Sequence, residues 1–353
     1  MPQIPAAKFA PAAALVSDAI AQRVTPAATV EAGSHDAVHW QTAAGTQTYD
    51  AGALACTVDT IFDLASLTKV IATTSLAMRA AEQDPRWLET PIAALEPRWR
   101  GADRAHVTIR HLLKHASGLP AHVKLFETVA GRGAFLERIV AEPLAFTPGS
   151  ESRYSDLGFI LLGLLLESRL GAPLDALFGS IAAHLDGPLL FAPPADMRSS
   201  IAPTEADAWR GRLLQGEVHD ENAAAMGGVA AHAGLFGTTR AVGSFAQTIL
   251  QTFRGDTWLA RQGTMRIFAT RSKVPGSSRA LGWDTMLPTS SCGTLMSPQA
   301  IGHTGFTGTS LWIDPENDLY VVLLTNRVHP TRDREGIQEL RRAVHDAVMQ
   351  AAR

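Results

Sequence analysis

Apolar residues follow a strand-like pattern near both ends of the chain. Near the C-terminus, Thr309–Ile313 and Leu319–Thr325 flank an Asp-Pro-Glu-Asn-Asp segment, which predicts a β-hairpin with a buried second strand. Near the N-terminus, Ala37–Thr42 and Thr46–Tyr49 flank Ala43-Ala44-Gly45, which predicts another hairpin. Strands at both ends indicate one sheet to which both ends of the chain contribute.

The middle of the chain carries helical patterns instead. Ser66–Ala81 contains neither Gly nor Pro and predicts one long, mostly buried helix. Thr108–His115 predicts a short helix. Leu157–Arg169 is apolar nearly all round, which predicts a buried helix that ends at Gly171.

Helices are also expected beside the terminal strands. The N-terminal segment leads into a predicted helix around Ala12–Gln22, and an apolar stripe near the other end predicts a C-terminal helix that packs on a flat surface. The stripe consists of Ile337, Leu340, Val344 and Val348. We therefore expect one α+β domain over residues 1–353: an antiparallel sheet subdomain at about 1–75 and 225–353, and a mainly helical inserted subdomain at about 76–224.

Composition and charge narrow the class of protein. The 353 residues are 46% hydrophobic and 18% charged, as in a globular protein with a large core. A net charge of −3 gives no indication of a nucleic-acid or anionic-membrane partner, and two distant cysteines indicate neither a disulfide framework nor a metal site. The apolar run Leu157–Leu166 is too short to span a bilayer, and the N-terminus lacks a signal-like pattern. We expect a cytoplasmic protein without a cofactor, and its oligomeric state stays open.

A first chemical motif is Ser66-Leu67-Thr68-Lys69. Helical positions three apart share a face, so Ser66 and Lys69 are expected within hydrogen-bond reach. A serine hydroxyl needs a base to become nucleophilic, and lysine can be that base if burial and nearby positive charge lower its pKa. The backbone N–H of Ser66, in the first turn, would be free to bind an oxyanion. Alone, the motif is weak and more readily fits a core helix with a buried serine and a lysine that reaches solvent.

A second motif is Tyr154-Ser155-Asp156, which opens the predicted buried helix. Tyr154 could relay a proton between Ser66 and a leaving group, and Asp156 could bind Lys69 or the substrate. Alternatively, Ser155 or Asp156 caps the helix and Tyr154 packs beside it, and both interpretations can hold together.

A third motif is His303-Thr304-Gly305, just before a predicted strand. His303 could present a proton or a positive charge, and Thr304 could bind a carboxylate or carbonyl. Gly305 would let a ligand lie against the strand edge, and the N–H of Phe306 could be a second oxyanion donor. The alternative is a simple turn into a strand. The three motifs in this order favour a serine hydrolase over the structural alternatives.

With these motifs, the sequence resembles the class C-type β-lactamase-related serine hydrolases, a group of penicillin-binding-protein-like D-alanyl-D-alanine carboxypeptidases, esterases and muramoyl-peptide amidases. The resemblance covers about residues 62–330. The matching stretches are Phe62–Lys69, Ile109–Leu119, Pro148-Gly149, Tyr154–Asp156, Gly216–Ala223, Gly227–Ala230, His232–Phe236 and Gly302–Ser310. It implies a β-lactamase/transpeptidase-like fold, Ser66 as the acylated nucleophile, Lys69 and Tyr154 as the acid–base pair, and the amides of Ser66 and Phe306 as the oxyanion hole.

Two positions depart from the pattern of that family. Asp156 stands where an asparagine is usual, and His303 stands where a lysine is usual, which argues against efficient β-lactam hydrolysis. His-Thr-Gly-Phe-Thr-Gly-Thr and Val-His-Asp-Glu-Asn resemble the carboxypeptidase and muramoyl-peptide amidase branch. We therefore expect hydrolysis of an amide bond in a cell-wall peptide or muropeptide fragment. An ester hydrolase of the same fold and a penicillin-binding or sensor protein without turnover are the alternatives.

Other polar clusters indicate structure rather than metal binding. His111 and His115 have a spacing that can bind zinc, but no glutamate accompanies them in a zinc motif. His219-Asp220-Glu221 are consecutive and cannot readily converge on one ion. The resemblance implies that this stretch lines the cleft, so a substrate contact is favoured over a metal site. We expect no metal.

Overall fold

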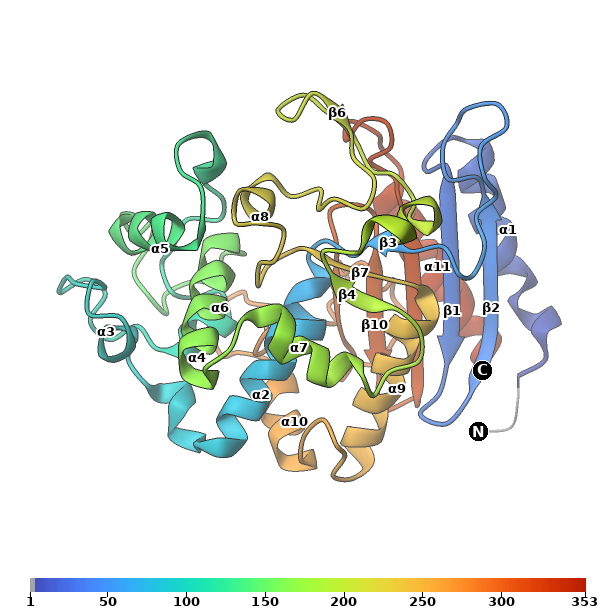
Figure 1. The fold of residues 1–353 in the computed structure, drawn as a ribbon. Coiled ribbons are helices and arrows are strands. Elements are labelled where there is room, and N and C mark those ends of the chain that lie inside the picture. The colour runs from blue at the N-terminus through green and yellow to red at the C-terminus, as the bar shows by residue number, and fades with distance from the viewer. Residues whose placement is uncertain (1–3) are drawn as a thin grey trace.

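The computed structural model describes residues 4–353, and its centre is a six-stranded antiparallel sheet (Figure 1). The strand order is β2-β1-β11-β10-β9-β8, so strands from both ends of the chain are neighbours. The strands are β1 (Ala27–Gly33), β2 (Val38–Gly45), β8 (Asp284–Thr285), β9 (Ile301–Thr304), β10 (Ser310–Asp314) and β11 (Leu319–Thr325). The predicted sheet built from both chain ends is confirmed.

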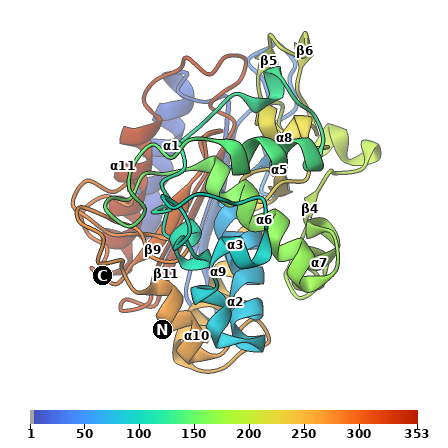
Figure 2. The same cartoon turned by 90° about the vertical axis from the view of Figure 1, so that its left-hand side faces the viewer.

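Strand β11 contributes side chains to the hydrophobic cores on both faces of the sheet. Its alternate side chains Leu319, Val321 and Leu323 join one apolar core with α1 (Ala10–Ala21) and α11 (Ile337–Ala352). The side chains between them join the second, larger core, which includes α9 (Thr239–Arg254). Helices α1 and α11 lie side by side on one face in both views (Figures 1 and 2). A strand buried on both faces must be apolar throughout, as its sequence is.

The predicted C-terminal hairpin is confirmed, but the prediction of a turn at Ala43-Ala44-Gly45 near the N-terminus is wrong. Strand β2 runs through Ala43-Ala44-Gly45 instead of turning there, and it pairs with β1. The small residues fit against the start of β1, with Ala28 opposite Ala44, and a Cβ at Gly45 would lie 2.0 Å from the Pro26 carbonyl oxygen. Close backbone packing, rather than a turn, therefore explains the Ala-Ala-Gly sequence.

Helices fill the other side of the sheet and form the middle of the chain (Figure 1). Its α-helices are α2 (Thr74–Gln83), α3 (Ile92–Leu95), α4 (Ile109–Leu113), α5 (Arg132–Ala141), α6 (Asp156–Leu170), α7 (Leu174–Ala182) and α8 (Glu221–Ala225), and α10 (Gln262–Ala269) follows α9. Helix α6 is buried and Gly171 caps its end in the left-handed conformation, as predicted. The boundaries of the two subdomains stay a prediction.

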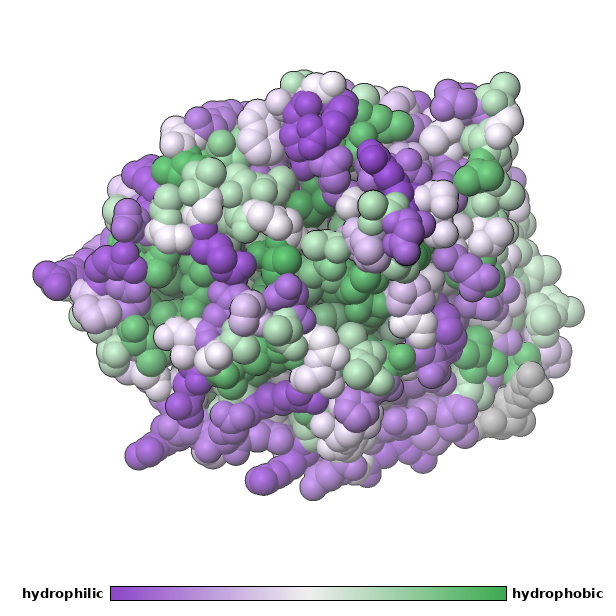
Figure 3. All heavy atoms as spheres, viewed as in Figure 1, coloured by the Kyte–Doolittle hydropathy of each residue, from purple (hydrophilic) through white to green (hydrophobic). Residues whose placement is uncertain are grey.

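Two small sheets complete the fold. Strand β7 (Leu235–Gly237) lies between β3 (Phe62–Asp63) and β4 (Leu189–Phe191), while β5 (Ala206–Asp207) pairs with β6 (Arg212–Leu213). On the face shown in Figure 3, hydrophobic residues gather in the middle and hydrophilic residues border them above and below. Within residues 4–353, no single helix is long and apolar enough to cross a membrane; α6 and α7 pass that test only as a pair bent by 80°.

Candidate active site

Ser66 lies in a sharp turn between β3 and the long central helix. Ala65 adopts a left-handed backbone with a φ of 47°, which is uncommon for a residue with a Cβ. The Asp63 side chain stabilises this turn by accepting from the Ala65 N–H at 2.8 Å. The backbone N–H of Ser66 has no hydrogen-bond partner within residues 4–353, so it is available to a ligand.

Lys69 begins a π-helical segment, η2 (Lys69–Thr73), that continues into α2. The predicted long helix is therefore present, with a change of hydrogen-bond pattern at the motif that only the structure reveals. Such π segments are rare and often occur at functional sites. The Lys69 Nζ lies 2.9 Å from Ser66 Oγ, 2.8 Å from Asp156 Oδ1 and 3.0 Å from the His232 carbonyl oxygen. These three contacts satisfy the three N–H donors of an ammonium group.

The electrostatics of Lys69 differ from the prediction. Its charged neighbour is the Asp156 carboxylate rather than a positive group. Burial by itself would lower the pKa of Lys69, but Asp156 and Tyr154 together outweigh burial, and the pKa is raised above its ordinary value. Burial by itself would raise the pKa of Asp156, but Lys69, His122 and His232 together outweigh burial, and that pKa is lowered. The resting pair is therefore an ammonium and a carboxylate.

Tyr154 contacts the same hydroxyl as Lys69. Its hydroxyl donates to Ser66 Oγ at 2.7 Å. The buried His115 ring packs against Tyr154 with ring centroids 4.8 Å apart, and its Nδ1 accepts from the Ser155 N–H at 3.0 Å. Ser155 also caps α6 by accepting from the Gly158 N–H. The capping and the catalytic interpretations of this segment thus hold together.

The His303 motif forms the end of β9 and the turn into β10. Phe306 is half exposed, and its N–H has no hydrogen-bond partner within the described chain. A Cβ on Gly305 would lie 2.6 Å from the Leu64 carbonyl oxygen and 2.1 Å from Thr309 Oγ1. The sequence interpretation of Gly305 was therefore incomplete, because the glycine is needed first for packing between β9 and the turn before Ser66.

Of the two roles that the sequence suggested for His303, a proton or a positive charge, the structure does not favour the positive charge. The residue is 3% exposed, and burial together with the nearby Arg279 guanidinium lowers its pKa well below the usual value for histidine. Its Nδ1 lies 2.8 Å from the Thr304 carbonyl oxygen, which can only accept, so Nδ1 carries the proton. His303 is a neutral imidazole with Nε2 unprotonated, and it does not supply a positive charge.

One cavity of about 560 Å³ brings the motifs together. Most of the residues singled out in the sequence line it: Ser66, Tyr154, Asp156, His303, Thr304, Gly305 and Phe306. Lys69 is completely buried directly behind Ser66 and reaches the cavity only through it. Within residues 4–353 no cluster of three or more His, Cys, Asp or Glu side chains is arranged to hold a metal ion.

Comparison with known proteins identifies the family. The beta-lactamase family model matches residues 12–346. This chain belongs to the beta-lactamase family. A relative from Escherichia coli (strain K12), named "Putative D-alanyl-D-alanine carboxypeptidase", is 36% identical over an alignment of 310 positions; the match covers 77% of this chain and 70% of the relative.

Solved structures share the fold of this beta-lactamase-family chain. A penicillin-binding protein homologue from Caulobacter crescentus has a TM-score of 0.77 at 17% identity and covers 99% of both chains. EstCE1, a hydrolase with promiscuous acyltransferase activity, has a TM-score of 0.76 at 21% identity and covers 97% of this chain and 99% of its own. The predicted fold is confirmed, and the chain is a serine hydrolase of the β-lactamase fold.

The cavity of this beta-lactamase-family hydrolase also contains residues that sequence analysis missed. They are His122, Arg279, Asp284, Arg327, Arg332 and Arg341. His122 Nδ1 lies 3.6 Å from Asp156 Oδ2, and Asp156 raises the pKa of this histidine. None of these residues belongs to a short motif, and only the fold brings them to the cavity, so no local signal could have identified them.

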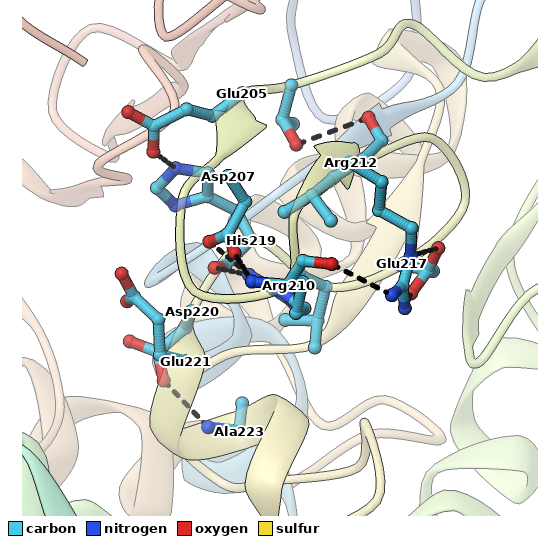
Figure 4. Close-up of polar contacts among 12 residues, drawn as sticks. Glu205, Asp207, Arg210, Arg212, Glu217, His219, Asp220, Glu221 and Ala223 are labelled. Atoms are coloured by element: carbon cyan, nitrogen blue, oxygen red, sulfur yellow. Dashed lines mark hydrogen bonds and ion pairs between the residues drawn. The ribbon is translucent and has the colours of Figure 1, made fainter. Parts of the chain in front are cut away.

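The His219–Glu221 segment forms one wall of the cavity, as the sequence suggested. Figure 4 shows how it is held: His219 Nε2 lies 2.8 Å from Glu205 Oε2, and Arg210 donates to the His219 carbonyl oxygen at 2.7 Å. Arg210 is anchored in turn by Asp207. The β5–β6 hairpin therefore stabilises this wall through Arg210.

Proposed function

We propose that this hydrolase cleaves an amide bond of a cell-wall peptide or muropeptide fragment through an acyl-enzyme on Ser66. One observation carries the proposal: Ser66 Oγ lies 2.9 Å from Lys69 Nζ and 2.7 Å from the Tyr154 hydroxyl at the floor of a cavity. A serine between a lysine and a tyrosine has partners for both proton transfers of acyl transfer.

In the proposed acylation, Ser66 Oγ attacks the scissile carbonyl. The free N–H groups of Ser66 and Phe306 would stabilise the developing oxyanion. Tyr154 would donate a proton to the leaving amine, so that the C–N bond breaks and the acyl group stays on Ser66. The proton that Lys69 took from Ser66 then passes to Tyr154, which restores the phenol and the neutral amine. Water attacks the ester of the acyl-enzyme, the acid is released, and a proton from that water restores the Ser66 hydroxyl.

The base for Ser66 is Lys69 in its neutral form, which requires its proton to move. Asp156 lies 2.8 Å away and can accept that proton. When substrate displaces water from the cavity, the two charges lose solvation by that water. This loss favours the neutral amine and the neutral acid over the ion pair. Lys69 can then take the Ser66 proton as attack occurs.

The preference for a peptide rests on the relative and on the cavity. The Escherichia coli relative is named as a carboxypeptidase, and a carboxypeptidase substrate carries a carboxylate beyond the scissile amide. Arg279 lines the cavity with its guanidinium 5.2 Å from the centre of the Tyr154 ring. Arg279 would supply the positive charge that His303 lacks.

The cytoplasmic location of the protein stays a prediction.

The test uses two active-site probes and one substrate pair. Fluorescent penicillin and a fluorophosphonate are incubated separately with the protein and with Ser66→Ala, followed by intact mass and mapping of the labelled peptide. We expect label on Ser66 and none in the variant. Release of D-alanine from an acyl-D-alanyl-D-alanine peptide is then compared with hydrolysis of an ester of the same acyl group.

The outcomes separate the hypotheses. A higher kcat/KM for the peptide, lost in Ser66→Ala, supports the amidase or carboxypeptidase activity. Turnover of the ester alone would favour the esterase alternative. A stable acyl-enzyme without turnover of either substrate would indicate a penicillin-binding or sensor protein, and absence of label in folded protein would overturn Ser66 as nucleophile.

A further inference from the structure

Two arginines at one end of the cavity have no acidic partner. Arg341 donates Nη2 to the carbonyl oxygens of Gly305 and Thr309, at 2.6 and 2.9 Å, and Arg327 donates only to backbone carbonyls, including that of Phe306 at 3.0 Å. No carboxylate lies within 4.0 Å of either guanidinium in the part of the chain that the structure describes. The neighbouring Arg332, in contrast, is paired with Glu205 and Glu221.

Burial makes the unpaired charge of Arg341 unusual. The residue is 3% exposed, its Nε has no hydrogen-bond partner, and it lines the same cavity as Ser66. Burial, followed by repulsion from Arg327, lowers the pKa of Arg341 to about 9. A buried guanidinium is ordinarily matched by an anion, because desolvating an unpaired charge is costly.

The start of α11 adds to the positive potential at this place. Ile337 and Gln338, the first two residues of this 16-residue helix, also line the cavity. The first hydrogen bond into the helix comes from the Leu340 N–H to the Gly336 carbonyl, and no side chain caps the terminus. The N–H groups of the first turn are therefore free and carry the positive end of the helix dipole.

We propose that Arg341, Arg327 and the first turn of α11 form a binding subsite for an anionic group of the substrate, a carboxylate or a phosphate remote from the scissile bond. The inference rests on the proposed function, since it concerns the substrate of the same cavity. Arg341 and Arg327 both contact the turn that presents the Phe306 N–H, so an anion bound here would also fix the oxyanion donor. The subsite would select anionic substrates over neutral ones of equal size.

A binding measurement tests the subsite without any turnover. Glutarate and inorganic phosphate are titrated separately into Ser66→Ala protein at low ionic strength by calorimetry. We expect at least one anion to bind and Arg341→Met to weaken its binding at least tenfold, whereas Arg342→Met, which changes an arginine outside the cavity, retains it. The two titrations distinguish a carboxylate site from a phosphate site. Absence of binding by both anions, or binding that Arg341→Met leaves unchanged, would overturn the subsite.

A kinetic measurement then links the subsite to catalysis. Matched p-nitrophenyl esters that end in a carboxylate or in its methyl ester are compared in active protein, and the ratio of their kcat/KM values is the readout. We expect the charged ester to be favoured about tenfold and the preference to disappear in Arg341→Met and in Gln338→Glu, which places a carboxylate at the subsite without altering the Gly305 turn. Arg342→Met is the matched control, because Arg342 binds Ser290 and Pro288 carbonyls outside the cavity.

The two measurements also keep the inference separate from the proposed function. If the unmodified protein hydrolysed neither ester, the proposed hydrolysis would be contradicted. Calorimetry on Ser66→Ala would still show whether the subsite binds an anion. Turnover of both esters with a ratio near one in the unmodified protein would contradict the subsite, while the proposed hydrolysis would stand.

Discussion

Lys69 and Asp156 form an ion pair 2.8 Å long immediately behind the Ser66 hydroxyl. The carboxylate stands where related enzymes usually carry a neutral amide, so the lysine of this chain meets a negative charge. The pair makes the resting lysine an ammonium group, and a proton must leave it before Ser66 can be activated. The pH dependence of the enzyme should report this pair.

Replacing Asp156 with asparagine should remove the group that accepts the Lys69 proton. In the unmodified protein Asp156 can take this proton at 2.8 Å, so neutral Lys69 forms without loss of a proton to solvent. In Asp156→Asn the lysine must lose its proton to solvent, so the acidic limb of kcat/KM should move to higher pH, by roughly two pH units or more. A pH profile with a small ester measures this, with thermal unfolding as the check on folding. An unmoved limb would contradict Asp156 as the proton acceptor.

His303 should stay neutral throughout the range in which ordinary histidines titrate. Burial and Arg279 hold its pKa well below 6.5, so the imidazole remains uncharged where an ordinary histidine gains its proton. Nitrogen-15 NMR of histidine-labelled protein should show a neutral ring protonated at Nδ1, with His303→Asn used to assign the signal. An imidazolium signal at pH 6 would show that the imidazole is charged and would restore a charged role for this residue.

Gly163 should be intolerant of a methyl group because α6 packs closely on the irregular segment around Ala231. A Cβ at Gly163 would lie 2.3 Å from the Ala231 Cβ. Gly163→Ala should therefore lower the free energy of unfolding by about 1–3 kcal/mol through overpacking. Gly179 in α7 is the matched control: its Cβ would meet nothing within 4 Å, so Gly179→Ala should stabilise by about 0.5–1 kcal/mol. Urea unfolding measures both, and equal effects would contradict the packing argument.

Glu31 should make stability depend on pH near neutrality. It is fully buried in the sheet with Arg240 and Tyr320, and burial raises its pKa from 4.5 to about 7 despite both contacts. A carboxyl group with a raised pKa stabilises the fold below its unfolded pKa and loses that contribution as pH rises through 7. The free energy of unfolding of Glu31→Gln should thus rise by roughly 2–3 kcal/mol relative to that of the unmodified protein as the pH goes from 5 to 8. Urea titrations at the two pH values check this, and a difference that does not change with pH would contradict it.

The sequence by itself determined the elements whose signals are local. The C-terminal hairpin, the buried α6 and the stripe on α11 follow from periodicity and turn residues, because burial on one or both faces constrains every position of such elements. The Ser66 and Tyr154 motifs could likewise be recognised, since their order along the chain and their spacing within a turn are properties of the sequence.

Tertiary structure decided what depends on neighbours distant in the chain. The pairing of β2 with β1 could not be inferred, because Ala43-Ala44-Gly45 signals a turn locally and close packing only in the sheet. The resting charges of Lys69 and His303 could not be predicted for the same reason: a pKa is set by burial and by charges brought within a few ångströms, here Asp156 and Arg279. The unpaired Arg341 carries no sequence signal, because the absence of a partner is a property of the folded cavity.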